Sequence, residues 1–406
     1  MRQGVVAGLV TLIAALGAAG VVADSAFPRE QAAAFTSAQL VEQKTAILLA
    51  ASSGTNAVAF SPEGELLASA YSDGAVWLWN PATGLSHELV PPASSPGSAD
   101  SVAFSPNGKL LASAYANGTI RLWNPATGHS VSALPRTTTG DRGSADNVAF
   151  SPNGKLLASA YANGTIRLWN PATGQPRHSP FRTGPEAQRS GVNGLAFSPD
   201  GKLLASAYAN GAVWVWNLAT GAGRVVTTPS GAHADSVAFS RAGGQLASAY
   251  SDGVIRLLNL ATGHSTVLQA SLASSAEAVA FSPAGDLLAG AYSDGTVRLW
   301  NPASGEATGP ALGSAGAGSG VNGLAFSPDG KLLAGAESNG TVRLWNPLAG
   351  QQGGLASGGW LVGAAAVIAI VLAALAVAIT ARGLGLANKW QPSRGRRLWR
   401  YCSSLP

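Results

Sequence analysis

One polar side chain recurs at the same place in seven related segments of this chain, four residues before a repeated phenylalanine. We call these seven side chains the collar: Asp100, Asp146, Asp235 and Glu277, with Asn56, Asn193 and Asn322. If the segments form a ring, the collar surrounds one mouth of its channel, where negative charge attracts a cation or a basic partner segment. Alternatively, each carboxylate bonds N–H groups of a nearby loop and is structural. We favour the structural interpretation.

Enzyme chemistry finds little support elsewhere in the chain. The five histidines fall in or near predicted loops, without the spacing of metal ligands. No glycine-rich phosphate loop stands between a predicted strand and a helix, and no serine occupies a nucleophile elbow. We therefore expect no catalytic residue, no metal and no cofactor, and we expect that the protein is not an enzyme. The alternative is a ligand- or metal-binding sensor, or a hydrolase, that uses the collar.

Two tryptophans are further candidates for partner binding. One predicted strand of the segment carries arginine in five of the seven copies, whereas Trp77 and Trp214 stand there in the other two. An exposed tryptophan can anchor a partner. It can equally pack between neighbouring segments, and this is the interpretation that we favour.

The elements that must position these side chains come from an internal repeat. Its phenylalanine recurs at intervals of 42 to 47 residues, as Phe60, Phe104, Phe150, Phe197, Phe239, Phe281 and Phe326. Nineteen residues after each phenylalanine stands a tryptophan, or Leu258 in the fifth repeat. The fixed distance indicates a rigid unit, and the variable remainder indicates loops.

The differences between repeats are concentrated in those loops. Residues 104–128 and 150–174 are identical, so these two repeats cannot carry different recognition. The longest predicted loops are 129–147 and 175–193. The second loop carries three arginines that contact a partner or simply remain solvated: Arg177, Arg182 and Arg189.

Each repeat predicts four short antiparallel strands. A Val-Ala-Phe strand leads into a Ser-Pro-Asn-Gly turn, in which proline and glycine suit the required backbone angles. A Leu-Leu-Ala-Ser-Ala-Tyr strand follows, and Asn-Gly or Asp-Gly then predicts a two-residue hairpin turn. Thr-Ile-Arg-Leu-Trp forms the third strand, and a weaker fourth strand ends the unit. Four strands every 40–50 residues are typical of a β-propeller blade.

From Thr45 to Gly350 the chain resembles the WD-repeat family, in its period, its turns and the end of its third strand. The resemblance implies a seven-bladed propeller that binds protein partners. Two features depart from the family pattern: Trp-Asn replaces Trp-Asp, as in Trp123-Asn124, and no repeat has the usual Gly-His pair. The family's hydrogen-bond network among histidine, serine, aspartate and tryptophan is therefore partial at best.

Thr45 to Ala50 is a better strand than the glycine-rich segment after the seventh repeat, so we expect it to supply the outer strand of the last blade and close the ring. Residues 24–44 predict a helical lead-in, with a weak similarity to bacterial membrane-linked WD-repeat proteins.

Two apolar segments flank the repeats. Residues 1–23 indicate a signal peptide or an uncleaved signal anchor. After a linker at 351–359, the uncharged segment Trp360–Ala381 is long enough to cross a bilayer as a helix. We therefore expect a transmembrane helix at 360–381.

The charge distribution predicts the orientation. The tail at 382–406 holds six basic residues and no acid, so a net charge of +5 leaves residues 1–381 at −1. A near-neutral propeller lacks the basic surface that nucleic acid requires, so we expect no nucleic-acid partner. The positive-inside rule places the tail in the cytoplasm. The sequence thus predicts an interaction scaffold in the cell membrane, with the propeller outside the cytoplasm and with a protein partner of unknown identity. A propeller on the cytoplasmic side is the alternative.

Overall fold

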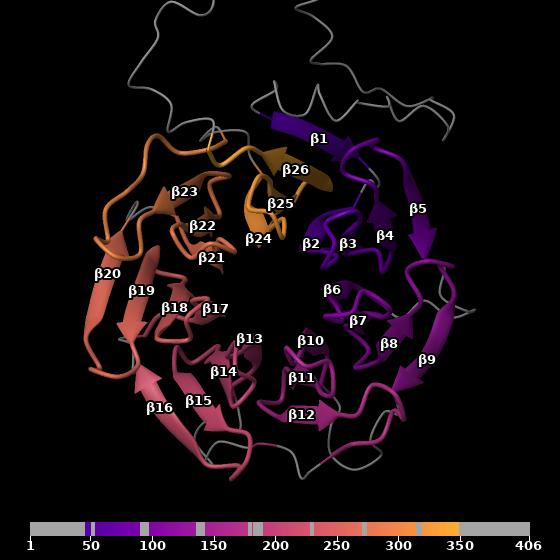
Figure 1. Ribbon diagram of the computed structural model, residues 1–406, viewed down its shortest axis with the longest axis horizontal. Coiled ribbons are helices and arrows are strands. Elements are labelled where there is room, and N and C mark those ends of the chain that lie inside the picture. Colours follow the sequence, from indigo (N-terminus) through magenta and orange to yellow (C-terminus); the bar gives the residue numbers. More distant parts are fainter. Residues whose placement is uncertain are drawn as a thin grey trace, which may run out of the picture. The chain divides into compact units, whose positions relative to one another are not determined.

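The computed structural model describes residues 45–49, 53–89, 97–134, 143–177, 181, 190–227, 231–269, 274–313 and 319–348. They form seven antiparallel sheets of three or four strands, arranged around a common axis (Figure 1). Within each sheet the strands follow chain order, from the first strand near the axis outwards, except that the seventh sheet has β1 at its outer edge (Figure 1). The all-β, seven-bladed propeller predicted from the repeat is confirmed.

The strands of the first four blades have the following bounds. Blade 1 comprises β2 (Thr55–Phe60), β3 (Leu67–Tyr71), β4 (Val76–Trp79) and β5 (Ser86–Leu89). Blade 2 comprises β6 (Ala99–Phe104), β7 (Leu111–Tyr115), β8 (Ile120–Trp123) and β9 (Ser130–Leu134). Blade 3 comprises β10 (Ala145–Phe150), β11 (Leu157–Tyr161) and β12 (Ile166–Trp169). Blade 4 comprises β13 (Val192–Phe197), β14 (Leu203–Tyr208), β15 (Val213–Asn217) and β16 (Gly223–Thr227).

The remaining strands complete the ring. Blade 5 comprises β17 (Ala234–Phe239), β18 (Gln245–Tyr250), β19 (Val254–Asn259) and β20 (Ser265–Gln269). Blade 6 comprises β21 (Ala276–Phe281), β22 (Leu288–Tyr292) and β23 (Val297–Trp300). Blade 7 comprises β24 (Val321–Phe326), β25 (Leu333–Glu337), β26 (Thr341–Trp345) and the N-terminal β1 (Thr45–Leu49).

Blade 7 closes the ring with strands from both ends of the repeat region. β1 pairs antiparallel with β26, from Thr45 opposite Trp345 to Leu49 opposite Thr341 (Figure 1). The buried side chain of Leu48 joins the core between blades 7 and 1. The predicted closure by the segment that begins at Thr45 is therefore confirmed. Because β1 covers the edge of β26, the last blade leaves no weak seam there.

The core lies between the blades rather than within them. Between blades 1 and 2, Leu78 and Leu89 of one blade bury Tyr115 and Trp123 of the next. The same positions form a similar cluster at the other junctions. Second strands such as β7 are buried along their whole length, and their alanines let the blades approach closely. Each fully buried leucine contributes about 2 kcal/mol through the apolar surface that it removes from water.

The contacts of the third-strand tryptophan differ between blades. In blades 1 to 4 its indole N–H donates to the serine of the second strand: Trp79 to Ser69 at 2.7 Å, Trp123 to Ser113 at 2.8 Å, Trp169 to Ser159 at 2.8 Å and Trp216 to Ser206 at 2.9 Å. In blades 6 and 7 glycine replaces that serine, and a Cβ atom on Gly335 would lie 2.5 Å from the Trp345 ring. The partial network predicted from the sequence is therefore present as Trp–Ser bonds in four blades.

The fourth strand is not regular in every blade. In blade 3 only isolated bridges pair the outer segment with β12, joining Trp169 to Pro176 and Ile166 to Phe181. The Arg177 N–H also donates to the Leu168 carbonyl at 2.8 Å, so the outer segment follows β12 without forming a regular strand. Blade 6 has two similar bridges in the same place.

Several predictions made from the sequence lie outside the described residues. These are the signal segment at 1–23, the lead-in at 24–44, the linker at 351–359, the helix at 360–381 and the tail at 382–406. In the part of the chain that the structure describes, no helix is long and apolar enough to cross a membrane.

Candidate functional site: the channel collar

The seven collar residues line one cavity at the axis of the propeller. Its volume is about 250 Å³, and every blade contributes the collar residue and the two residues that follow it. The ring expected from the repeat is therefore formed. Around the axis the collar residues follow the order of the blades: Asn56, Asp100, Asp146, Asn193, Asp235, Glu277 and Asn322. Two pairs of acids from adjacent blades thus alternate with amides.

A β-bulge presents each collar side chain. In blade 2, Ala99 pairs with Tyr115 and Ser101 pairs with Ala114, so that Asp100 between them has no partner in the ladder. The same irregularity falls on the collar residue of the other six blades. A bulge turns a side chain away from the regular alternation of its strand. It explains how one position in every blade meets its neighbours at the channel.

The three collar amides connect neighbouring blades. Each donates to the backbone carbonyl just before the collar residue of the next blade: Asn56 to Ala99 at 2.9 Å, Asn193 to Ala234 at 3.1 Å and Asn322 to Thr55 at 2.8 Å. The last of these bonds joins blade 7 to blade 1. The amides therefore act as clasps between blades, a role that the sequence alone did not reveal.

The carboxylates accept bonds from side chains. The Ser98 hydroxyl donates to Asp100 at 2.6 Å, and the Ser144 hydroxyl donates to Asp146 at 2.5 Å. The Asn193 amide donates to Asp235 at 3.0 Å. These donors are hydroxyl and amide groups rather than the loop N–H groups expected from the sequence. The physical reason is the bulge, which directs the carboxylates toward the channel.

Burial raises the pKa of all four acids. The pKa of Asp146 rises to about 6, because desolvation outweighs the bond from Ser144 and the nearby charge of Asp100 adds to the rise. Desolvation also raises the pKa of Asp100 and Asp235. The pKa of Glu277 rises through burial and through the charge of Asp235. Each acidic pair therefore resists carrying two negative charges.

This arrangement does not make a metal site by itself. Among the described residues, no three histidine, cysteine, aspartate or glutamate side chains are placed so that they could hold one ion. The aspartates in the turn between the second and third strands, the residue type of the family network, bond within their own turns. Asp73, for example, accepts from the N–H of Ala75 at 2.9 Å.

Trp77 and Trp214 are half-buried and pack against blade cores. Trp77 stacks on Trp79 with ring centroids 5.9 Å apart, and Trp214 stacks on Trp216 at 5.3 Å. Both contact the cores between blades. The geometry supports packing, which we favoured from the sequence, over an exposed anchor.

Of the three arginines in the long loop, the structure describes only Arg177, which does not line the collar cavity. Arg177 is exposed and lines a different groove. Arg182 and Arg189 lie outside the described residues, as do residues 135–142, 178–180 and 182–189 of the two connections at 129–147 and 175–193.

Comparison with known families agrees with the fold. The family model described as WD domain, G-beta repeat matches residues 43–80, 94–124, 127–170, 179–217, 260–301 and 313–346. The unmatched interval 218–259 contains the first three strands of blade 5, whose third strand has Leu258 in place of the tryptophan. A comparison with curated proteins found no match. The six matched segments cover more than half of the chain, which therefore belongs to the WD-repeat family.

Proposed function

We propose that this protein is a protein-interaction scaffold held in a membrane, with its propeller on the outer side. Propellers of this family generally bind protein partners. The observation that carries the proposal is the contrast between constant blades and variable connections. Residues 104–128 and 150–174 are identical, whereas the chain between successive repeat phenylalanines varies from 42 to 47 residues. Recognition then belongs to the connections.

The connections adjoin the collar. Each first strand begins at the channel mouth, because its bulged collar residue is its second residue. A connection between blades therefore ends at the collar, and loops and collar together present one face to a partner. This favours a basic partner segment at the channel mouth, where four carboxylates meet.

The membrane part of the proposal is supported by the sequence. The segment 360–381 is uncharged and long enough to span a bilayer. The basic residues after it favour a cytoplasmic tail and a propeller outside. Protease treatment of intact cells tests this orientation, since an external propeller is cleaved and a cytoplasmic one is protected.

Cross-linking in intact cells, purification through a C-terminal tag and mass spectrometry test the scaffold. The control variant has residues 129–147 and 175–193 replaced by the shorter connection 222–236. A partner recovered with the native connections but not with the control supports the proposal. No enriched partner from folded, abundant protein contradicts it.

A ligand sensor or hydrolase at the collar is the second candidate, and the acid-lined cavity is the observation in its favour. Calcium titration of the protein and of the Asp100→Ala, Asp146→Ala, Asp235→Ala triple variant distinguishes it. Binding that the folded triple variant loses would support this candidate, and an identical response of both proteins would exclude a calcium site.

A further inference from the structure

Blade 3 carries a groove at the edge of the propeller opposite the collar. First and third strands run in the same direction, so both end at that edge, and the turns after them lie there together. In blade 3 these turns are Asn153–Lys155 and Pro171–Gln175. With Pro176 and Arg177 they enclose a groove of about 670 Å³. Its position separates it from the collar, and only Gln175, Pro176 and Arg177 of its lining belong to the connection 175–193.

Two cations line the groove, and none of the described residues in its lining is an acid. Lys155 comes from the first turn and Arg177 from the segment after the second, and both are exposed. The Arg177 backbone is fixed, because its N–H donates to the Leu168 carbonyl at 2.8 Å. This bond anchors the backbone of the outer segment beside the groove, whose lining includes Arg177.

Whether the lysine of the first turn has an acidic neighbour depends on the residue two positions before it, which is aspartate in some repeats and asparagine in others. In blades 4 and 7 the matching lysines have an aspartate beside them, Lys202 with Asp200 at 3.7 Å and Lys331 with Asp329 at 3.3 Å. In blade 3 that residue is Asn153, whose side-chain oxygen accepts from the Lys155 N–H at 3.0 Å. The turn keeps its shape, and Lys155 has no acidic partner among the residues that the structure describes.

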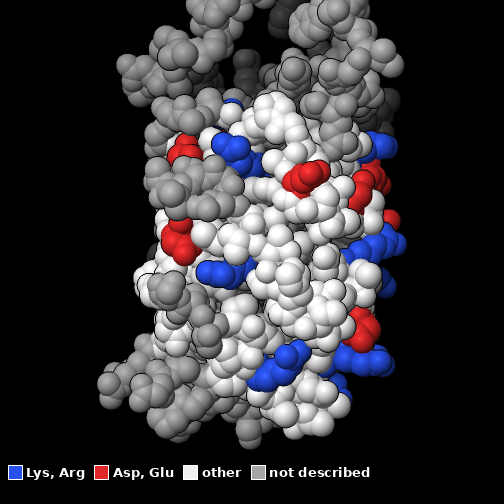
Figure 2. Space-filling model, turned by 90° about the vertical axis from the view of Figure 1, so that its left-hand side faces the viewer, with Lys and Arg blue, Asp and Glu red and all other residues white. Residues whose placement is uncertain are grey.

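Viewed from one side, Lys and Arg side chains alternate with Asp and Glu along the right-hand edge of the ring rather than forming a continuous basic band (Figure 2). Two isolated cations in a groove do not follow a phosphate backbone, which requires many contacts. Two cations can instead pair with two carboxylates of one extended peptide segment, because each ion pair needs only one carboxylate within reach. The groove is also much larger than a single ion.

From these observations we propose that the blade 3 groove binds an acidic peptide segment of a protein partner, with Lys155 and Arg177 pairing its carboxylates. The inference rests on the proposed scaffold function, because its ligand is a protein segment. It goes beyond that function in adding a second binding face and in naming the chemistry of the partner there.

The test is fluorescence anisotropy with the full chain in detergent micelles and a labelled octaglutamate peptide. We expect the Lys155→Ala, Arg177→Ala double variant to lose about tenfold in affinity, because both ion pairs to the peptide carboxylates are removed. A labelled octaglutamine peptide should not bind. Both substitutions are on exposed side chains, so unchanged thermal unfolding confirms that the double variant is folded.

Blade 2 provides a matched control within the same chain. Lys109 occupies an identical turn, but Ser130 and Val131 stand where blade 3 has Pro176 and Arg177, and Val131 is 57% exposed. Lys109→Ala should therefore leave affinity unchanged. Adding Ser130→Pro and Val131→Arg to the double variant should restore at least part of the binding, now at blade 2.

Three results would overturn the inference. The first is that the wild-type chain does not bind octaglutamate. The second is that Lys109→Ala weakens binding as much as the double variant does. The third is that a single-stranded oligonucleotide binds through Lys155 and Arg177 more tightly than the peptide does. Because binding is read on purified protein, these results are independent of partner capture in cells. If no partner is captured in cells, the scaffold proposal is contradicted. Peptide binding by the purified protein is still measured separately.

Discussion

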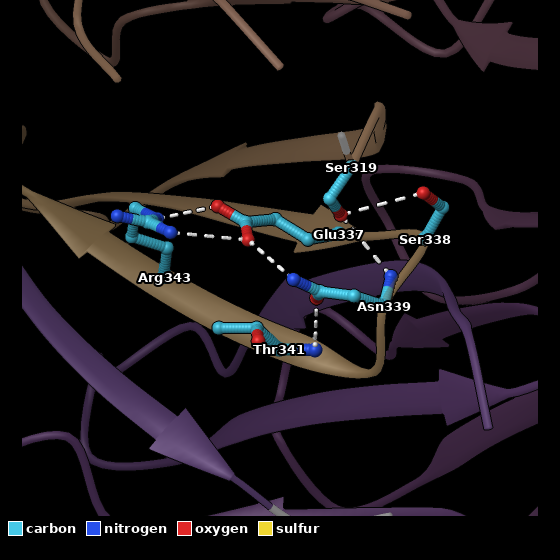
Figure 3. Close-up of polar contacts among 6 residues, drawn as sticks. All are labelled: Ser319, Glu337, Ser338, Asn339, Thr341 and Arg343. Carbon is cyan, nitrogen blue, oxygen red and sulfur yellow. Dashed lines mark hydrogen bonds and ion pairs between the residues drawn. The ribbon is translucent and has the colours of Figure 1, made fainter. Parts of the chain in front are cut away.

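Arg343 of β26 donates two hydrogen bonds to Glu337 of β25, one of them from Nη2 at 3.2 Å (Figure 3). Glu337 is buried, and it stands where the other six blades end their second strand with tyrosine. In blade 5 the matching pair is a cation over a ring, with the Arg256 guanidinium 5.4 Å from the centre of Tyr250. Blade 7 thus replaces an aromatic contact by an ion pair, in the blade that closes the ring.

Glu337→Ala should destabilise the propeller. It leaves Arg343, whose side chain is only 22% exposed, without its acid, and breaking a buried pair costs about 3 kcal/mol. Because Arg343 lies opposite Ile47 of β1, we expect faster hydrogen exchange in β1 as well. Urea unfolding and exchange measurements check both effects. Glu337→Tyr restores the residue of the other blades and should cost less than Glu337→Ala; an equal or larger loss would contradict the role assigned to the pair.

Closure by β1 gives a second prediction. Leu48→Ala should lower the free energy of unfolding by about 2–4 kcal/mol, because Leu48 is 6% exposed within the core between blades 7 and 1. Leu85, which is 63% exposed, provides the control. Leu85→Ala should change stability by less than about 0.5 kcal/mol. Similar losses in both variants, measured by urea unfolding, would show that β1 is not tied to the core.

The fold could be predicted from the sequence because each repeat shows the same strand pattern and the same turn residues at nearly regular intervals. It also located closure at Thr45, since that segment is the better strand. The collar was placed correctly, but its interactions were not. A β-bulge takes Asp100 out of the regular in-and-out alternation of side chains along its strand. No residue type in the sequence predicts where such a bulge occurs. The Asn322 clasp joins residues 267 positions apart in the chain, which only the closed ring brings together.

Single exceptions to the repeat were also difficult to interpret from sequence. Glu337 among tyrosines suggests an irregularity, but its partner Arg343 occurs in the same place in four other blades. The groove of blade 3 is lined in part by Pro176 and Arg177, which follow the second turn as an irregular outer segment. The sequence makes Arg177 a candidate contact, whereas its place in one groove with Lys155 depends on two turns meeting at one edge.

Restoring the repeat serine in blade 7 should destabilise the protein. Gly335→Ser adds a Cβ atom that would lie 2.5 Å from the Trp345 ring, which is buried. The indole N–H of Trp345 has no acceptor among the described residues, so the new hydroxyl offers a bond. Overpacking costs about 1–3 kcal/mol, more than one neutral hydrogen bond returns.

Thermal unfolding measures the effect of Gly335→Ser. Ser113→Gly in blade 2 is the reciprocal change, and it should destabilise the protein because the Trp123 indole loses its hydrogen bond. A rise in the unfolding temperature of Gly335→Ser would mean that the ring can move aside.

The collar should make stability fall as the pH rises from about 4 to about 7. Asp146 has a pKa of about 6 in the folded protein, above its ordinary value of 3.8. The folded state therefore binds the proton more tightly than the unfolded state. Its stabilising effect is complete below pH 4 and is lost as the pH rises through 6. Asp146→Asn removes the ionisation, so the variant should exceed the wild type in stability at pH 7.5 by about 1–3 kcal/mol. At pH 4.5 the two proteins should differ much less.

Urea unfolding of both proteins at the two pH values measures this difference directly, and comparing variants cancels the other titrating groups. Asp200→Asn is the control, because bonds from Ser198 and the Lys202 N–H lower the pKa of this exposed carboxyl. That control should not gain stability on going from pH 4.5 to 7.5. If Asp146→Asn gains nothing at pH 7.5, the carboxylate of Asp146 is compensated when charged, and a cation or a bound basic segment at the collar becomes the explanation to test.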